Sequence, residues 1–406
     1  MGYRPRRRVD AGRDDQRGLA LTLTVLVSVF LLVGAAGALW WTGAGGYAWW
    51  WLTNTTPPTL ALEAPTGAVR STVTVQVRTE PTGRAGPVEA RINDAPLPPG
   101  EQVAVDTTKL PDGQHQVVVV AEDRSWRRNR TTASVTLLTD NTPPQLTVDS
   151  QPRQVLQGHT WLVRIRTNEP AAVDARLGGR ELPISVGNGY GWAIVGFSPT
   201  ADAVTVPVTV DGRDPAGNTS QVSEPVQVAA EQFVRDEVTV PATLADLLSG
   251  EVRAEEDRRL AEYYKPVTPE KFWEGRFLLP VTGPIITEFG TIRSFNGGPV
   301  VGNHQGADIA APSGRPVVAP GRARVYKIEE VRLRGNMVIL DHGLGVYSTY
   351  AHLSAVDVKV GDMVERGQAF AKVGSTGLST GPHLHWEMWV GGANVNPIEW
   401  TERDIP

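Results

Sequence analysis

A segment that recurs at a spacing of about 85 residues constrains the fold of this 406-residue chain more than any other feature. Asn-Thr-Thr-Pro-Pro-Thr-Leu, starting at Asn54, returns as Asp-Asn-Thr-Pro-Pro-Gln-Leu, starting at Asp140. After each copy, apolar and polar residues alternate, over residues 73–78 and again over residues 161–166. A period of two is typical of strands with one buried face. Short strands at this density predict two tandem antiparallel β-sandwiches.

The two units, residues 55–140 and 141–229, resemble the immunoglobulin-like repeats of bacterial surface proteins, on few fixed positions. The resemblance implies two Ig-like β-sandwiches. They act either as a passive stalk or as modules that bind wall polymers or cell-wall and division partners. His115 and His159 lie within the two units, each without a second ligand at a useful spacing, so both are interpreted as ordinary structural histidines.

The first 41 residues differ from the rest of the chain. Residues 1–17 form a basic tail with six arginines, and no charged residue occurs from Gly18 to Leu39. Residues 18–41 therefore predict a transmembrane helix, which ends in a group of tryptophans typical of a membrane interface. The arginines place the N-terminus in the cytoplasm and the later domains outside it, as a single-pass protein of the cell membrane. A cleaved signal peptide, with its site at residues 36–38, is the alternative.

Composition excludes several classes of function. The chain has no cysteine, so thiol nucleophiles, iron–sulfur clusters and thiolate zinc sites are excluded. A formal net charge of -5 argues against nucleic-acid binding, which needs an excess of basic residues. Any catalytic metal must then be held by histidine and carboxylate side chains.

Residues 230–276 are more charged than the sandwiches and have apolar residues at helical spacing from Leu244 to Leu260. They predict a short helical connector with Thr243 as a helix cap.

Residues 277–402 contain five of the seven histidines. His383 and His385 flank Leu384 in a strand-like stretch, so both imidazoles face the same side. His304 and Asp308 are also an even number of residues apart, and Gly306 between them allows a tight backbone path. Two histidines and one carboxylate form a ligand set that suits Zn²⁺ with an open fourth position. His352 is a further candidate.

These motifs closely resemble the LytM-type, lysostaphin-like zinc metallopeptidases of family M23. His304 to Asp308 resembles their H-x-x-x-D element, His383 to His385 their H-x-H element, and the stretch around His352 their central histidine motif. The resemblance covers about residues 280–400. It implies an antiparallel β domain of the duplicated-hybrid type. The whole chain is therefore expected to be mainly β, with one transmembrane helix, two Ig-like sandwiches, a short helical connector and this C-terminal domain.

The resemblance also implies roles for five residues. His304, Asp308 and His385 would bind one Zn²⁺ per chain, and His352 and His383 would be the unliganded catalytic histidines. His352 is favoured as the base and His383 as the stabiliser of the oxyanion. The expected function is a membrane-anchored zinc endopeptidase that hydrolyses peptide bonds of peptidoglycan during wall remodelling or division. The alternative is a catalytically silent module of the same fold that binds the wall or activates an amidase.

Overall fold

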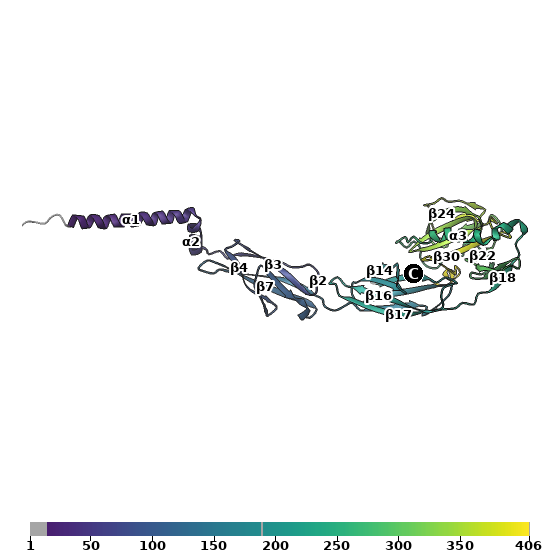
Figure 1. The fold of residues 1–406 in the computed structure, drawn as a ribbon, viewed down its shortest axis with the longest axis horizontal. Helices are drawn as coiled ribbons and strands as arrows, with labels where there is room; N and C mark the ends of the chain where they lie inside the picture. Colours follow the sequence, from purple (N-terminus) through teal and green to yellow (C-terminus); the bar gives the residue numbers. More distant parts are fainter. Residues whose placement is uncertain (1–13, 188–189, 406) are drawn as a thin grey trace, which may run out of the picture. The chain divides into compact units, whose positions relative to one another are not determined.

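The computed structural model describes the backbone of residues 14–187 and 190–405, and leaves out the side chains of residues 14–26 and 39, among others. After two N-terminal helices the chain is built mainly of strands, as expected (Figure 1). It divides into two compact units, Met1–Thr142 and Pro143–Pro406. The division differs from the predicted domains, because the second sandwich and the C-terminal domain fall in the same unit.

The first unit begins with helices α1 (Asp14–Trp41) and α2 (Ala44–Thr53). α1 covers the segment predicted to span a membrane, residues 18–41, while most of the predicted basic tail, residues 1–13, lies outside the described residues. Within the described part of the chain, no helix reaches the combination of length and hydropathy that a membrane span needs.

Two sheets pack face to face in the first unit. One has the order β1-β3-β6 and the other the order β2-β8-β7-β4-β5. Val75 and Val77 point inward with Val117 and Val119 of the opposite sheet, so the predicted alternation is correct. The strands are β1 (Thr59–Glu63), β2 (Ala68–Val69), β3 (Thr72–Glu80), β4 (Ala85–Ile92), β5 (Ala95–Leu97), β6 (Gln102–Asp106), β7 (Gly113–Asp123) and β8 (Arg130–Thr139), with a 3₁₀ turn η1 (Thr107–Lys109).

The second sandwich repeats this connectivity, with sheets β14-β15-β11-β9 and β10-β17-β16-β12-β13. A short parallel pair closes one edge in both sandwiches, β2 with β8 and β10 with β17. The strands are β9 (Leu146–Gln151), β10 (Gln154–Leu156), β11 (Thr160–Thr167), β12 (Ala172–Leu177), β13 (Arg180–Leu182), β14 (Ser185–Gly187), β15 (Tyr190–Gly196), β16 (Thr205–Arg213) and β17 (Thr219–Ala229). The repeated sequence segment thus corresponds to a repeated strand order, to which the second sandwich adds β14.

Both faces of strand β11 are buried in its first half. Trp161 faces the core of the sandwich, whereas Leu162 belongs to the hydrophobic core of the C-terminal domain, together with Trp192 and Ile194 of β15. The side chain of Glu399 also accepts a hydrogen bond from the backbone N–H of Thr160 at 2.9 Å. This sandwich is therefore part of the structural support of the C-terminal domain.

The connector is only partly helical. It contains strand β18 (Arg235–Val238), the 3₁₀ helix η2 (Ala242–Leu248) and helix α3 (Gly250–Tyr263). The predicted cap Thr243 is wrong: Ser249 caps α3, and its side chain accepts a hydrogen bond from the backbone N–H of Val252 at 3.2 Å. β18 joins a small sheet, β18-β20-β21, with β20 (Ile292–Phe295) and β21 (Val300–Asn303).

The C-terminal domain is centred on a large antiparallel sheet of order β19-β22-β30-β26-β25-β24-β28, with β31 also paired to β30. The domain also contains a smaller, three-stranded sheet of order β23-β29-β27. The elements are β19 (Ile285–Thr287), β22 (Ala307–Ala310), β23 (Pro316–Val318), β24 (Ala323–Val331), β25 (Gly335–Gly343), β26 (Val346–Ala351), β27 (Ala355–Val356), β28 (Met363–Val364), β29 (Ala369–Lys372), β30 (His383–Val390), β31 (Ala393–Val395) and α4 (Glu399–Glu402).

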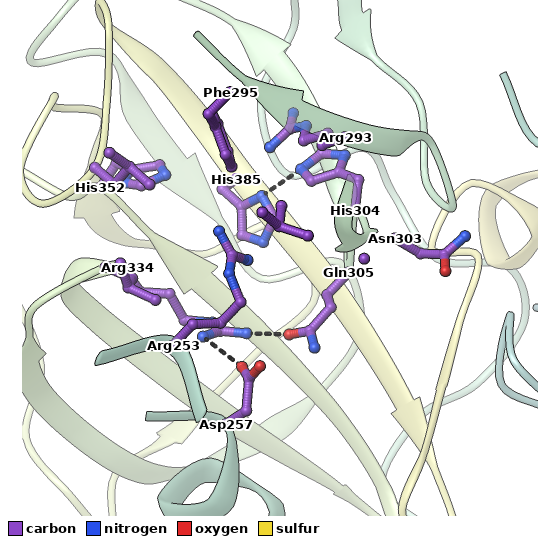
Figure 2. A pocket seen from close by; sticks show the side chains of 14 residues that line it. Arg253, Asp257, Arg293, Phe295, Asn303, His304, Gln305, Arg334, His352 and His385 are labelled. Carbon is purple, nitrogen blue, oxygen red and sulfur yellow. Dashed lines mark hydrogen bonds and ion pairs between the residues drawn. The ribbon is translucent and has the colours of Figure 1, made fainter. Parts of the chain in front are cut away.

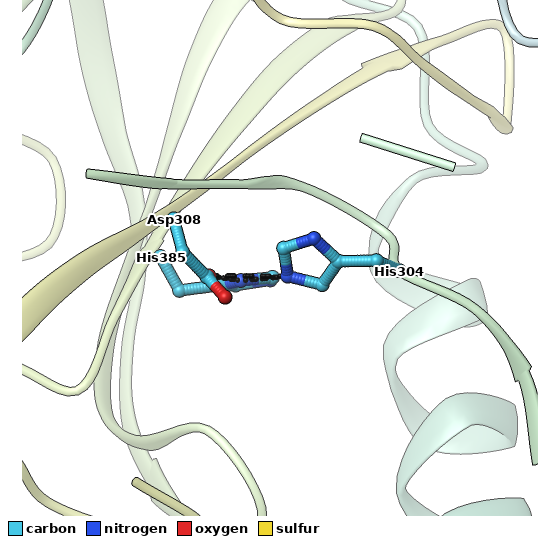
Figure 3. A group of neighbouring side chains, drawn as sticks. All are labelled: His304, Asp308 and His385. Carbon is cyan, nitrogen blue, oxygen red and sulfur yellow. Dashed lines mark hydrogen bonds and ion pairs between the residues drawn. The ribbon is translucent and has the colours of Figure 1, made fainter. Parts of the chain in front are cut away.

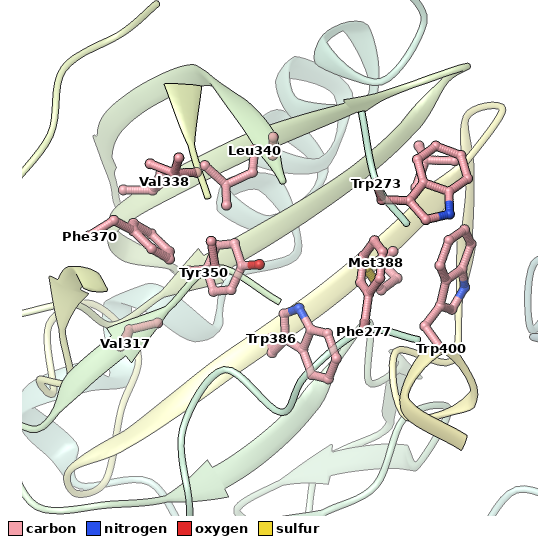
Figure 4. Packing of buried hydrophobic residues seen from close by; sticks show 14 of the residues in the cluster. Trp273, Phe277, Val317, Val338, Leu340, Tyr350, Phe370, Trp386, Met388 and Trp400 are labelled. Carbon is pink, nitrogen blue, oxygen red and sulfur yellow. The ribbon is translucent and has the colours of Figure 1, made fainter. Parts of the chain in front are cut away.

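The two faces of strand β30 have different neighbours. Leu384, Trp386 and Met388 point into the main core, beside Tyr350 and Phe370 from neighbouring strands (Figure 4). Trp386 is completely buried, as expected for a core residue. The opposite face carries the histidines at one end, and Trp389 at the other end stacks on Tyr264, just after α3, with ring centroids 4.1 Å apart.

We expect α3 to be essential for the stability of this domain. Leu260 of α3 is buried against Met337, Ile339 and Tyr347 of the large sheet, so Leu260→Ala should lower the free energy of unfolding by about 2–5 kcal/mol. Urea denaturation would measure the loss. Glu262→Ala, at an exposed position of the same helix, is the control and should change it by less than about 0.5 kcal/mol. Equal stability of the two variants would mean that α3 is a loosely attached linker.

Candidate metal centre

Strand register brings the predicted ligands together. β22 and β30 are antiparallel neighbours with Asp308 directly opposite His385. On the other side of β30, Ala351 of β26 is the partner of His385, so His352 follows immediately at the end of β26. His304 begins the turn between β21 and β22. Four separate chain segments thus converge because three neighbouring strands are paired in this register.

Gly306 allows the turn that carries His304 to approach β30. A Cβ atom at this position would lie 2.4 Å from the backbone oxygen of Trp386 and 2.9 Å from the ring of His385. Both separations are shorter than van der Waals contact, so any larger residue would displace His304 or the strand. The tight backbone path expected from the sequence is present.

The ligand atoms of His304, Asp308 and His385 form a compact triangle (Figure 3). His385 Nδ1 lies 2.7 Å from Asp308 Oδ1 and 3.0 Å from His304 Nε2. His304 Nε2 lies 3.1 Å from Asp308 Oδ1. A tetrahedral ion with bonds of about 2.0–2.2 Å separates its ligand atoms by roughly 3.3–3.6 Å. A slight opening of the triangle would therefore accommodate a metal ion, and all three residues are buried.

Hydrogen bonds orient both histidines of the triangle. His304 Nδ1 donates to the backbone oxygen of Glu288 at 3.0 Å, which leaves Nε2 without a proton for the site. His385 Nε2 lies 3.0 Å from the carboxylate of Glu387, which leaves Nδ1 for the site. Asp308 uses Oδ1 at the site, and its Oδ2 accepts from Arg293 at 2.6 Å. Partners of this kind, which hold the ligand tautomer and direction, are characteristic of protein metal sites.

The electrostatics of the triangle favour a cation. Burial by itself raises the pKa of Asp308, but His304 and His385 outweigh it and hold the pKa well below its ordinary value. Burial lowers the pKa of His304 to about 4, so this imidazole is neutral at neutral pH. At His385, burial is outweighed by the hydrogen bonds to Asp308 and Glu387, and the pKa is raised. The carboxylates of Asp308 and Glu387 therefore favour positive charge at the triangle, beside the neutral imidazole of His304.

His352 and His383 face the same space without joining the triangle. Their ring centroids are 4.7 Å apart, and the ring of His352 lies 5.8 Å from that of His385. His352 Nδ1 donates to the backbone oxygen of Thr376 at 2.7 Å, and His383 Nδ1 donates to that of Gly381 at 2.8 Å. A carbonyl oxygen only accepts, so in the neutral rings both Nε2 atoms are unprotonated.

His352 has an unusual backbone conformation and a lowered pKa. Its φ of 59° is in the left-handed region, where residues other than glycine are uncommon and often functional. Burial, followed by the charges that His385 and His383 can carry, lowers the pKa of His352 to about 3. The imidazole is therefore neutral over the whole physiological pH range.

His342 lies inside strand β25, near its end. Its Nε2 is 2.7 Å from the hydroxyl of Ser348, and its Nδ1 is 3.2 Å from the backbone oxygen of Arg322. Burial lowers the pKa of His342 to about 4. These contacts make it a fully buried structural residue outside the metal triangle.

A buried ion-pair network behind the triangle was not predicted from the sequence. Arg334 donates to Glu387 at 2.7 Å and to Glu256 of α3 at 3.0 Å. Burial alone would raise the pKa of Glu387, but Arg334 and His385 outweigh it and lower the pKa to about 2. The carboxylate that orients His385 is therefore charged and fixed. Glu387 could have been found from its position, since it shares the strand face of His385, whereas no local pattern points to Arg334 or Glu256.

A pocket of about 90 Å³ opens onto the triangle (Figure 2). His304, His385 and His352 line it from the large sheet and the preceding turn, while Arg253 and Asp257 line it from α3. A segment that was expected only to connect two domains therefore forms one wall of the site.

Comparison with known proteins places this geometry in a family. The model of peptidase family M23 matches residues 302–397. Peptidoglycan DD-endopeptidase ShyB of Vibrio cholerae is 39% identical over 112 residues, which are 27% of this chain and 25% of that protein. ShyA, a peptidoglycan DD-endopeptidase of the same organism, is 41% identical over 99 residues, 24% of this chain and 23% of ShyA.

Two further matches cover similar or longer stretches. The DD-carboxypeptidase/endopeptidase Mpg of Neisseria meningitidis is 44% identical over 95 residues, 23% of this chain and 22% of Mpg. A solved peptidase M23 structure from Pseudomonas aeruginosa matches 61% of this chain and 94% of its own, with 25% identity and a TM-score of 0.45. The chain thus covers about a quarter of the length of these curated relatives. Residues 302–397 are a peptidase family M23 domain.

Proposed function

We propose that this protein is a membrane-anchored zinc endopeptidase that hydrolyses peptide bonds in the stem peptides or cross-links of peptidoglycan, in wall remodelling or division. The observation that carries the proposal is the presence of two imidazoles, His352 and His383, that face the metal triangle with unprotonated Nε2 atoms. A site that only holds a metal needs no such groups. A hydrolase needs a proton acceptor and a group that stabilises negative charge.

Zinc is the metal proposed for His304, Asp308 and His385. Two imidazole nitrogens and one carboxylate oxygen form the donor set of many catalytic zinc sites, which keep a fourth position open. Harder ions such as Mg²⁺ prefer oxygen ligands. When bound there, Zn²⁺ polarises a carbonyl and lowers the pKa of a coordinated water from about 15.7 to about 7.

The chain's own residues supply the remaining chemistry. His352 accepts a proton from the attacking water through Nε2, because its Nδ1 donates to the backbone oxygen of Thr376, which holds the ring in place and leaves Nε2 unprotonated. His383 is held by Gly381 and faces the same space, where its imidazole stabilises the negative charge that develops on the carbonyl oxygen. Glu387 and Arg293 hold His385 and Asp308 in position.

Peptidoglycan is proposed as the substrate because relatives of the matched stretch are named peptidoglycan DD-endopeptidases. The alternative is a module that binds the wall or activates an amidase without hydrolysing it. A degenerate module has no need for a complete set of five residues, and all five positions are filled here. The hydrolase is therefore the better supported of the two.

The position of the protein in the cell is also proposed. Residues 18–41 anchor it as a single pass, with the N-terminus in the cytoplasm and residues beyond about 52 outside it. The uncharged stretch from Gly18 to Leu39 and the exposed apolar side chains of α1, among them Phe30 at 81% exposure, support this proposal. The two sandwiches, residues 55–140 and 141–229, act as Ig-like modules that reach the wall or its division partners.

Removal of the metal tests the enzymatic proposal. Purified protein should release peptides from isolated peptidoglycan, lose this activity in a chelator and regain it with added Zn²⁺. Mass spectrometry of the released muropeptides would identify the broken bond. Protein that holds one zinc per chain but releases no peptide from any wall preparation would contradict the hydrolase proposal and favour the binding module.

A further inference from the structure

Three arginines, Arg253, Arg293 and Arg334, line the pocket that opens onto the metal triangle. Two of them are neutralised by carboxylates. Arg293 donates to Asp308 at 2.6 Å, and Arg334 lies between Glu387 and Glu256. These two side chains hold the site together and have little capacity to bind another anion.

Arg253 is different. No carboxylate in the described part of the chain lies within 4.0 Å of its guanidinium group, and its recorded contact is with the ring of Phe295, whose centroid is 5.6 Å away. Asp257, one turn later on the same helix, lies 3.7 Å from Arg334 instead. Figure 2 shows the side chain of Arg253 extending from α3 toward His385. A cation thus points into the pocket with no carboxylate of the described residues at ion-pair distance.

The surroundings of Arg253 make its positive charge energetically unfavourable. Burial lowers the pKa of Arg253 from its ordinary value, the nearby Asp257 opposes the shift, and Arg334 and Arg293 add to it. Removing a charge from water without a compensating partner is unfavourable. An anion bound in the pocket would relieve both the desolvation and the repulsion between the arginines.

Helix α3, which carries Arg253, is held against the large sheet by hydrogen bonds, an ion pair and apolar packing. Glu256 accepts a hydrogen bond from the backbone N–H of Leu333 at 2.7 Å, and it also pairs with Arg334. Leu260 and Tyr264 are buried against the large sheet. The guanidinium is therefore presented from a rigid element, which is what specific recognition of a ligand needs.

We propose that Arg253 binds a free carboxylate of the peptide substrate beside the metal centre. This inference rests on the proposed function and specifies its substrate: a peptide with a carboxylate close to the scissile bond. A planar guanidinium suits this role because it can donate two parallel hydrogen bonds to one carboxylate. The carboxylate belongs either to the chain end next to the scissile bond or to an acidic side chain at that position.

Binding of small probes tests this inference without turnover. Full-length, zinc-loaded protein carrying His352→Ala would be titrated with N-acetyl-D-alanyl-D-alanine and with its C-terminal amide, by calorimetry or ligand-detected NMR. The free acid should bind about 10- to 100-fold more tightly than the amide, as expected for a charge-assisted hydrogen bond. A third probe, N-acetyl-D-alanyl-D-glutamic acid with an amidated terminus, shows whether a side-chain carboxylate is preferred instead.

Arg253→Gln should abolish the preference for the carboxylate while the zinc content stays the same. Arg253→Lys keeps the charge and should retain an intermediate preference, which guards against a simple folding defect. Arg258→Gln is the matched control, because Arg258 lies on the same helix but is exposed, and its side chain donates a hydrogen bond to the backbone oxygen of Ala254. It should bind all three probes like the parent protein.

Two results would overturn the inference: no preference for a carboxylate in the parent protein, or an unchanged preference in Arg253→Gln. The second result would assign the carboxylate to the metal or to Arg293. Neither result bears on hydrolysis. Conversely, a clear preference in a protein that releases no wall peptides would contradict the proposed function alone.

Discussion

His304→Ala or Asp308→Ala is expected to remove both the bound metal and the release of wall peptides, whereas His352→Ala keeps the metal and loses turnover. The first two residues supply atoms of the triangle, whose three members lie 2.7 to 3.1 Å apart, so two remaining ligands hold a metal weakly. His352 only faces the triangle. Its loss removes a proton acceptor, which typically contributes about 10²- to 10⁴-fold to the rate.

The measurement combines metal content, from mass spectrometry of the purified variants, with the rate of muropeptide release. His159→Gln is the control, because His159 lies in the second sandwich and is not a member of the triangle. It should keep one metal ion and full activity. Loss of metal from the His352 variant would show that His352 is a ligand and that the division of roles among the histidines is wrong.

Arg334→Met is expected to lower the free energy of unfolding of the C-terminal unit by about 3–5 kcal/mol. The substitution leaves Glu256 and Glu387, both buried, without their common cation. Burial alone lowers the pKa of Arg334, but the interactions with Glu387, Tyr264 and Glu256 outweigh it and raise the pKa above its ordinary value. The charge of Arg334 is therefore stabilised by Glu256 and Glu387. Both carboxylates are buried, so water cannot replace the guanidinium when it is removed.

Denaturation in guanidinium chloride would measure the loss. Arg332→Met is the matched control, since Arg332 is two residues away and exposed, and it should change stability by less than about 0.5 kcal/mol. If Arg334→Met is as stable as this control, the network contributes little and Glu256 docks α3 through its bond to Leu333 alone. Adding Glu256→Gln to Arg334→Met should recover part of the loss, because one buried charge is then removed.

Several features could be predicted from sequence because they depend on local order. On a strand, residues two apart share a face, and this is why His383 and His385 were correctly expected to point to one side. The repeated segment correctly indicated two sandwiches, since the same strand order recurs in both. Gly306 was correctly expected to permit a tight turn.

Other predictions failed where a second element changed the environment. The alternation over residues 161–166 predicted a single buried face, but Leu162 on the other face packs into the core of the C-terminal domain. The connector was expected to be helical, but residues 235–238 pair with β20 as a strand. Such pairing depends on a partner more than 50 residues away in the chain, and the local pattern contains no information about it.

The amino-acid sequence by itself indicated the mainly β architecture and singled out His304, Asp308, His383 and His385, because strand periodicity and the spacing of histidines are local properties. The roles of these residues and of His352 came from the resemblance to family M23. Only the tertiary structure decided what surrounds them. It brought Arg253 and Glu256 of the connector to the site and placed Arg334 between two buried carboxylates. Long-range packing created these contacts, since burial of Leu260 and Tyr264 against the large sheet brings charges together that no spacing along the chain relates.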